Sequence, residues 1–201
     1  MNRAEKRVGC LFLAFLVLLG IAGAIGYAVY KAIDSGELTK DFQPVDDTRY
    51  DAEIAAAAAK HNIPTELVRA VIRRESRFVA DTRGSKGEIG LMQILPSGAG
   101  AEWARVNKCP RPTAMELYDV ETNLDIGCWY LARALKRWKD YRHGTELALA
   151  EYNAGFRNVR KWAPKDRNAE VIPRIGFRGT KEYVTTIMKY YQQELDKKAL
   201  R

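Results

Sequence analysis

Glu75 is the residue of this 201-residue chain whose type and position most directly indicate chemistry. It lies in the segment 64–78, where apolar side chains recur at the spacing of one helix face, namely Leu67, Val68, Val71 and Ile72. Glu75 is the next member of that face, one turn beyond Val71. A carboxyl among apolar neighbours loses hydration, so its pKa rises and it can act as a general acid near neutral pH. The alternative is a glutamate at a frayed helix end, facing water beside Arg73, Arg74 or Arg77.

Three other segments combine aromatic faces with amide groups. Residues 90–93 end in Gln93, which can donate and accept hydrogen bonds, and they begin with a glycine that lets a backbone approach a ligand. Residues 150–155 place Tyr152 and Asn153 before a glycine at a helix end, and residues 180–184 place Tyr183 in the last helix. Flat apolar faces beside amides suit a sugar groove. Taken alone, each segment is better explained as core or as a helix cap.

Other kinds of active site lack their residues in this sequence. The two histidines, His61 and His143, are far apart and have no companions at metal-ligand spacing. No serine sits in a strand-turn-helix elbow, and no glycine-rich loop has the usual phosphate-binding form. These absences favour chemistry performed by a carboxylate, and we expect neither a metal ion nor a cofactor.

The elements that must position these residues are predicted to be helices almost throughout from Arg49 onward. Apolar periodicity predicts helices over 50–62, from Pro64 to Glu75, after Pro96, and over 121–139, 145–152, 156–163 and 180–199. The loop after Glu75 contains three glycines and has room for a short hairpin. We therefore expect a mainly α, single globular domain over residues 49–201, with at most one small β element.

The N-terminal segment predicts a membrane anchor. Residues from Val8 to Tyr30 carry no charge, and as a helix they would be roughly 35 Å long, enough to span a bilayer. Basic residues precede this run, which predicts residues 1–30 as a cytoplasmic tip and single-pass signal anchor in the cytoplasmic membrane. Residues 31–48 form a linker, and the domain lies on the periplasmic or extracytoplasmic side. A signal peptide cleaved near Ala24 is the alternative, but the apolar run continues past that point.

Charge and cysteines give weaker indications. The formal net charge is +8, and the predicted exported part is still basic, which suits an anionic polymer of the cell envelope. Nucleic acid is a poorer partner, because the basic residues are scattered and no nucleic-acid motif is present. In an oxidising compartment Cys109 and Cys128 could form a disulfide that closes a loop of about 20 residues and contributes ~3 kcal/mol. Two separate thiols are the alternative, and we favour the disulfide.

The order of the motifs resembles the soluble lytic transglycosylase family of peptidoglycan-cleaving enzymes. Glu75-Ser76, Gly90-Leu91-Met92-Gln93 and the run Glu-Tyr-Asn-Ala-Gly over 151–155 follow one another as in that family, and the similarity extends over about residues 50–195. The resemblance implies a lysozyme-like fold with one catalytic glutamate at Glu75. That acid would protonate the oxygen between N-acetylmuramic acid and N-acetylglucosamine. It would then take the proton of the muramic C6 hydroxyl, which closes a 1,6-anhydro ring.

The same resemblance implies six further site residues, namely Ser76, Met92, Gln93, Tyr152, Asn153 and Tyr183. Ser76 would hold the Glu75 carboxyl or the substrate, and Tyr183 would lie near the acid. Tyr152 and Asn153 would position the acetamido group and the sugar, while Met92 and Gln93 would line the groove. The segment before Thr180 is about three residues longer than the usual pattern, which bears on Tyr183 and the far wall of the groove.

Two other functions are compatible with the sequence. One is a muramidase that uses water, for which the unusual acid Glu151 would be the second carboxylate, about 6.5–9.5 Å from the first. The other is a non-catalytic protein that binds or scaffolds peptidoglycan. The expected partners are peptidoglycan glycan strands, the membrane through the N-terminal helix, and a trans-envelope assembly, with no nucleic acid.

Overall fold

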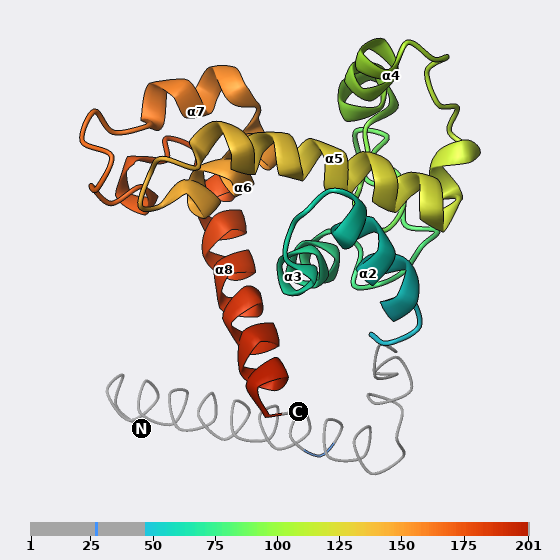
Figure 1. Ribbon diagram of the computed structural model, residues 1–201, viewed down its shortest axis with the longest axis horizontal. Helices are drawn as coiled ribbons and strands as arrows, with labels where there is room; N and C mark the ends of the chain where they lie inside the picture. Colours follow the sequence, from blue (N-terminus) through green and yellow to red (C-terminus); the bar gives the residue numbers. More distant parts are fainter. Residues whose placement is uncertain (1–26, 28–46, 201) are drawn as a thin grey trace, which may run out of the picture. The chain divides into compact units, whose positions relative to one another are not determined.

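The structure is a computed structural model that describes Tyr27 and residues 47–200 (Figure 1). The helices are α2 (Asp51–Lys60), α3 (Thr65–Glu75), α4 (Ala101–Asn107), α5 (Val120–Trp138), α6 (Gly144–Ala154), α7 (Phe156–Trp162) and α8 (Arg178–Ala199). Three shorter helical turns are η1 (Pro96–Gly100), η2 (Glu116–Tyr118) and η3 (Ile172–Arg174). The mainly α fold predicted from the periodicity is confirmed.

The predicted anchor over residues 1–30 and the linker over 31–48 fall almost entirely outside the described residues. The chain divides into two units, Met1–Val45 and Asp46–Arg201, and the second unit contains α2 to α8. Of the helices in the described part, none is both long and apolar enough to cross a membrane. The single-pass topology therefore stays a prediction.

Helix α5 lies at the centre of the packing (Figure 1). It contacts α2, α4 and α6, and the apolar stripe predicted for it supplies Leu124, Cys128 and Leu131 to the core, all fully buried. The helix begins where the side chain of Asp119 accepts a hydrogen bond from the Thr122 backbone N–H at 2.8 Å, a typical N-cap. The N-capped and centrally packed α5 is thus the helix against which the other elements of the site are held.

Helix α3 packs along α8 and ends at the edge of the core. It begins after Pro64, as predicted, and its stripe of Leu67, Val68, Val71 and Ile72 is buried. Glu75 continues that stripe and is the last residue of the helix. Its side chain therefore lies at the edge of the core. The periodicity therefore predicted both the helix and the inward side of Glu75.

The small β element is present in the loop between α3 and η1 as two isolated antiparallel bridges, which join Ile89 to Arg83 and to Ile94. Gly90 has φ +80°, and a Cβ there would lie 2.2 Å from Nδ2 of Asn123, so only glycine fits. The buried Asn123 amide donates to the carbonyls of Ile89 and Leu117, each at 2.8 Å, and accepts from the Met92 N–H at 2.8 Å. One side chain of α5 thereby fixes the loop.

The disulfide favoured from the sequence is wrong, because Cys109 and Cys128 are both free thiols. Cys128 is buried on the inward stripe of α5, with Sγ 3.9 Å from Sδ of Met92, and burial raises its pKa to about 12. Cys109 follows the end of α4, half-buried, with Sγ 3.9 Å from the Ala104 carbonyl. The helical stripe turns Cys128 into the core, where it packs on Met92 and not on Cys109.

Candidate active site

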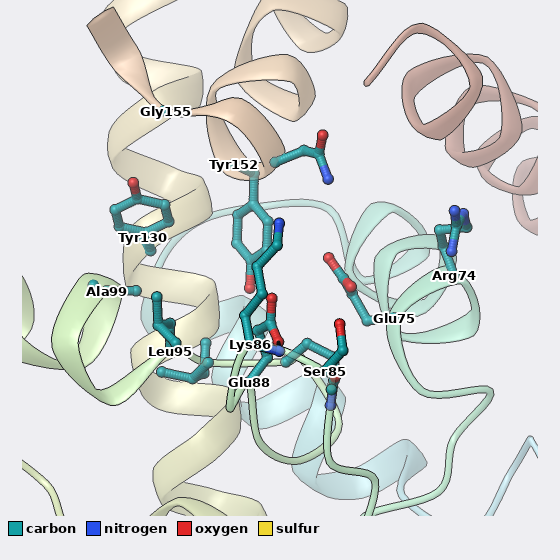
Figure 2. A pocket seen from close by; sticks show the side chains of 15 residues that line it. Arg74, Glu75, Ser85, Lys86, Glu88, Leu95, Ala99, Tyr130, Tyr152 and Gly155 are labelled. Carbon is teal, nitrogen blue, oxygen red and sulfur yellow. Dashed lines mark hydrogen bonds between the residues drawn. The ribbon is translucent and has the colours of Figure 1, made fainter. Parts of the chain in front are cut away.

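A cleft of about 490 Å³ opens where α3 ends (Figure 2). Its walls come from the end of α3, the loop over residues 84–95, η1, one face of α5 and the C-terminal end of α6. The polar side chains that line it are Arg74, Glu75, Ser85, Lys86, Glu88, Gln93, Tyr130, Tyr152 and Asn153. Residues far apart in the sequence thus meet around one hollow, and Glu75 is among them.

Glu75 is half-buried and has an uncharged hydrogen-bond partner. The Tyr183 hydroxyl donates to its Oε1 at 2.6 Å. Burial raises the Glu75 pKa from 4.5 to about 7, against the lowering effects of the Tyr183 hydrogen bond and the Arg74 charge, with Glu88 adding to the rise. The frayed-end alternative does not hold, because the carboxyl is shielded from water and bonds to Tyr183, while Arg73 contacts Gln193 and the Tyr190 ring. The geometry is that of an acid able to hold or release a proton near neutral pH.

Helix α8 supplies the partner of the acid and joins it to α6. Tyr183 is 2 % exposed, and burial, followed by the nearby Glu75 charge, raises its pKa well above the usual range, so the hydroxyl keeps its proton. Thr180, one turn earlier, donates its hydroxyl hydrogen to Oδ1 of Asn153 at 2.7 Å. The longer segment before Thr180 therefore leaves Tyr183 beside Glu75 and ties the end of α6 in place.

Tyr152 and Gln93 lie in the cleft, as the sequence predicts. The Tyr152 hydroxyl donates to the Met92 carbonyl at 2.8 Å, and its ring meets the Tyr130 ring edge-on at 5.5 Å between centroids. Gln93 has φ +48°, and its side-chain N–H₂ donates to the carbonyls of Thr82 and Gly90 at 3.1 and 3.0 Å. Both residues are locked by backbone contacts, so they form a fixed wall opposite the acid.

Ser76 and Met92 do not line the cleft, which corrects their predicted roles. The buried Ser76 hydroxyl donates to the Leu91 carbonyl at 2.9 Å and makes no hydrogen bond to Glu75. The Met92 side chain is fully buried against Gly127, where a Cβ would come within 2.3 Å of its sulfur. These two residues instead hold the 90–93 segment against α3 and α5.

Glu151 does not line the cleft, so it is not the second carboxylate that a hydrolase would need. It is 3 % exposed, and its carboxylate accepts from the Trp138 indole N–H at 2.7 Å and lies 3.3 Å from Nε of Arg137. Burial raises its pKa, against the lowering effects of the Trp138 hydrogen bond and the Arg137 charge. Its neighbours make it a structural group between α5 and α6.

Sequence reasoning missed the charged wall formed by residues 84–88. Glu88 and Lys86 both line the cleft and come from the same loop (Figure 2). The Glu88 carboxylate accepts from the Lys86 backbone N–H at 2.9 Å. The signal was present, since Ser85-Lys86-Gly87-Glu88 is a polar run directly before the 90–93 motif. The cleft therefore holds a second carboxyl that did not enter the sequence prediction.

The assembled cleft combines groups suited to a polyhydroxylated ligand with a group that can transfer a proton. It combines one acid with a pKa of about 7, aromatic faces and amides. Within residues 47–200 no three His, Cys, Asp or Glu side chains gather closely enough to hold a metal ion. An acid placed in this way can protonate an ether oxygen and then take a proton back from a nearby hydroxyl.

Proteins of known kind are similar to this chain in sequence and in fold. Residues 52–174 match the family described as Transglycosylase SLT domain. Membrane-bound lytic murein transglycosylase E of Buchnera aphidicola is 34% identical over 144 residues, which cover 70% of this chain and 65% of that protein. The chain therefore spans slightly less than two thirds of that relative.

Two solved structures have the same helical arrangement. An inactive glutamate-to-glutamine mutant of lytic transglycosylase Slt from Pseudomonas aeruginosa has a TM-score of 0.64 and 27% identity, covering 86% of this chain and 29% of that one. The 70 kDa soluble lytic transglycosylase of Escherichia coli has a TM-score of 0.65 and 27% identity, covering 73% of this chain and 24% of that one. With a lysozyme-like helical fold and a family match over more than half of its length, the chain belongs to the transglycosylase SLT domain family.

Proposed function

We propose that this protein is a peptidoglycan lytic transglycosylase that cleaves the β-1,4 bond between N-acetylmuramic acid and N-acetylglucosamine and leaves a 1,6-anhydro-muramic end. The observation that carries the proposal is the Glu75 carboxyl. It lines the cleft, its pKa is raised to about 7, and it accepts a hydrogen bond from the Tyr183 phenol. The names of the relatives, lytic murein transglycosylases, support it.

One carboxyl performs both proton transfers. Protonated Glu75 gives its proton to the glycosidic oxygen, and the bond from that oxygen to the anomeric carbon breaks. The resulting carboxylate takes the proton of the muramic C6 hydroxyl, whose oxygen closes on the anomeric carbon, so no water is consumed. A pKa near the working pH allows both steps, and the substrate acetamido group takes the part of a second carboxylate. The Tyr183 hydroxyl stabilises Glu75 between the steps, because it donates to the ionised form.

The walls of the cleft position the sugar. Tyr152 and Tyr130 present aromatic faces, and Asn153, fixed by Thr180, offers its amide N–H₂ to the acetamido group. Gln93 shapes the loop side of the cleft. Ser76 and Met92 contribute indirectly, since they keep the loop in place.

Anchoring to the membrane is a further part of the proposal. The uncharged run from Val8 to Tyr30 inserts as a single-pass anchor, and residues 49–201 face the extracytoplasmic side. The linker over 31–48 then confines cleavage to wall near the membrane, for general turnover or within a trans-envelope assembly. Protease digestion of intact and permeabilised cells, together with membrane fractionation, tests this topology. The proposed anchor requires a domain that is accessible from outside the cytoplasmic membrane and that also sediments with the membrane, whereas a cleaved signal peptide would release it.

The chemistry is tested by digesting purified wall and weighing the products. The parent protein should release fragments with anhydro ends, and Glu75→Gln, which keeps the shape of the side chain, should be slower by about a thousandfold. Glu182→Gln, an exposed substitution on α8, is the control. If Glu75→Gln released products as fast as the parent, Glu75 would not be the acid and a binding or scaffolding role would remain.

A hydrolase is the second candidate, and Glu88 is the observation in its favour. Two carboxyls lining one cleft can protonate a leaving oxygen and activate a water, if the water fits between them. Reducing ends in the parent digest that disappear in Glu88→Gln would assign hydrolysis to this protein. Anhydro ends that persist in Glu88→Gln would leave the transglycosylase as the function.

A further inference from the structure

A second hollow of about 670 Å³ lies between the turn that joins α2 to α3 and one face of α5, and it shares no lining residue with the cleft. Trp129, Arg133 and Lys136 face it from α5 at intervals of four and three residues, so they share one side of that helix. Ile63 and Pro64 supply an apolar wall. We call this hollow the α5 groove.

The charge of the α5 groove is one-sided. Lys136 and Lys139 line it, are exposed, and form no ion pair with the part of the chain that the structure describes. The nearby acid Asp125 is already bound by Lys60 at 2.8 Å and by His61 at 2.6 Å. No aspartate or glutamate of residues 47–200 lines the groove itself. Free cations without competing carboxylates attract an anionic polymer.

Aromatic rings connect the α5 groove with the cleft across the outside of α5. Trp129 lines the groove, and its ring lies 6.3 Å from that of Tyr130, which lines the cleft. Tyr130 in turn meets Tyr152, and the Arg133 guanidinium lies 4.9 Å from the Trp129 ring centre and 5.9 Å from that of Tyr130. The aromatic residues of the two hollows are therefore neighbours on α5, and one polymer of sufficient length could reach both.

We propose that the α5 groove binds a second stretch of peptidoglycan glycan, with a sugar face on Trp129 and stem-peptide carboxylates at Lys136 and Lys139. The inference rests on the proposed function, because it takes the same polymer as its ligand. Indole faces suit the apolar side of a sugar, and ammonium groups complement stem carboxylates. The groove holds the enzyme on the wall while the cleft acts, and it takes no part in the proton transfers.

Co-sedimentation with purified insoluble wall tests the proposal, using the full chain with Glu75→Gln in phosphatidylcholine nanodiscs so that the wall stays intact. The double variant Lys136→Glu/Lys139→Glu should bind roughly tenfold more weakly at low salt, with a difference that shrinks as salt rises. Trp129→Ala should also weaken binding, and Trp129→Phe should restore most of it. Lys161→Glu/Lys165→Glu makes the same charge change on exposed lysines outside both hollows and should change binding less than twofold.

Two results would overturn the α5 groove as a glycan site. One is an equal effect of the two lysine pairs, which would reduce the groove to general surface charge. The other is a loss of wall binding in Lys136→Glu/Lys139→Glu that is seen only when the nanodiscs contain phosphatidylglycerol. That result would make the α5 groove a lipid-headgroup site. Failure of the proposed function is recognised separately, because it would appear as missing anhydro products from the parent while the binding comparison still stands. The lysines are exposed, so the test does not depend on a variant that disturbs the core.

Discussion

The packed pair of helices α3 and α8 carries a glutamate toward each end, Glu194 at one and Glu75 at the other. Their pKa values are shifted in opposite directions. At one end, Glu194 accepts from Nε of Arg69 at 2.8 Å and from Nζ of Lys197 at 2.9 Å. Burial acts to raise its pKa, but these hydrogen bonds and charges hold the pKa below the usual range. At the other end, Glu75 accepts from the Tyr183 hydroxyl and from no other side chain of residues 47–200, and burial raises its pKa to about 7.

The difference teaches that the partner of a buried carboxyl, more than its burial, decides whether it can act as an acid. Arg69 also contacts Asp51 and Asp47, so that end of the helix pair is an ion-pair network. Arg74, the cation closest in sequence to Glu75, lies over the Tyr183 ring at 5.6 Å and does not bind the carboxyl. Without a cation bonded directly to it, Glu75 marks the proposed catalytic end of this interface, and Glu194 with Arg69 marks the structural end.

Removing the cation of the structural end should have the largest effect on stability. Arg69→Met leaves Glu194 and Asp51 without their guanidinium, and the free energy of unfolding should fall by about 3 kcal/mol. Urea denaturation followed by circular dichroism measures this. Arg178→Met, which breaks an exposed pair with Glu182, should cause no measurable loss. Equal losses in the two variants would show that the network around Arg69 is not special.

Neutralising Glu75, at the proposed catalytic end, should stabilise the fold in a pH-dependent way. The raised pKa of Glu75 favours the folded state below about pH 4.5, and this advantage is lost as pH rises through 7, because the unfolded carboxyl ionises first. Glu75→Gln does not titrate, so it should match the parent at pH 4 and exceed it by at most about 3 kcal/mol at pH 8. Urea denaturation at the two pH values measures the difference. A parent that is the more stable protein at pH 8 would contradict a raised pKa.

Removing the Tyr183 hydroxyl should widen the difference in pKa between Glu75 and Glu194. Tyr183 donates to the ionised form of Glu75 and lowers its pKa, so in Tyr183→Phe the alkaline limb of the pH–rate profile should move to higher pH. Turnover should fall about tenfold, because the carboxylate between the two steps loses its donor. Tyr190→Phe, which keeps the ring stacked under Arg73, is the control. Movement of the limb to lower pH would mean that Tyr183 does not stabilise the carboxylate.

Glu88 should give the smallest shift, and one of the opposite sign. Its negative charge acts to raise the Glu75 pKa, so Glu88→Gln should move the alkaline limb of turnover to lower pH. The other groups that act on the Glu75 carboxyl are unchanged in the variant, namely Arg74, Tyr183 and Tyr152. Glu121→Gln, an exposed substitution on α5, should leave the profile in place. An unchanged profile in Glu88→Gln would place that carboxyl too far from Glu75 to matter.

Helix periodicity predicted the part of the site that depends on helix faces. The stripe of α3 placed Glu75 at the edge of the core, and the stripe of α5 placed Cys128 inside it. The disulfide was predicted from compartment and loop length, although the same stripe that buries Cys128 turns it toward Met92. Where two lines of reasoning conflicted, the face of the helix decided the outcome.

Side-chain directions in the loops could not be predicted from the pattern. Arg77 and Phe78 have φ of +52° and +62°, so the chain reverses directly after α3 and the Ser76 hydroxyl turns to the Leu91 carbonyl. The motif identified Met92 by position, but only the close approach of Gly127 explains why its side chain points away from the cleft. Glu88 lies in a segment without periodicity, which left it without a predicted direction.

The Asn123 amide that joins three backbone groups has a consequence for redesign. Segment 89–92 and helix α5 behave as one rigid piece, so substitutions there disturb the scaffold before they alter what the cleft accepts. Residues 84–88 reach the same cleft without that clamp, and Ser85 and Lys86 are exposed. Engineering of substrate preference in this protein should therefore begin at Ser85 and Lys86 and leave the 90–93 motif intact.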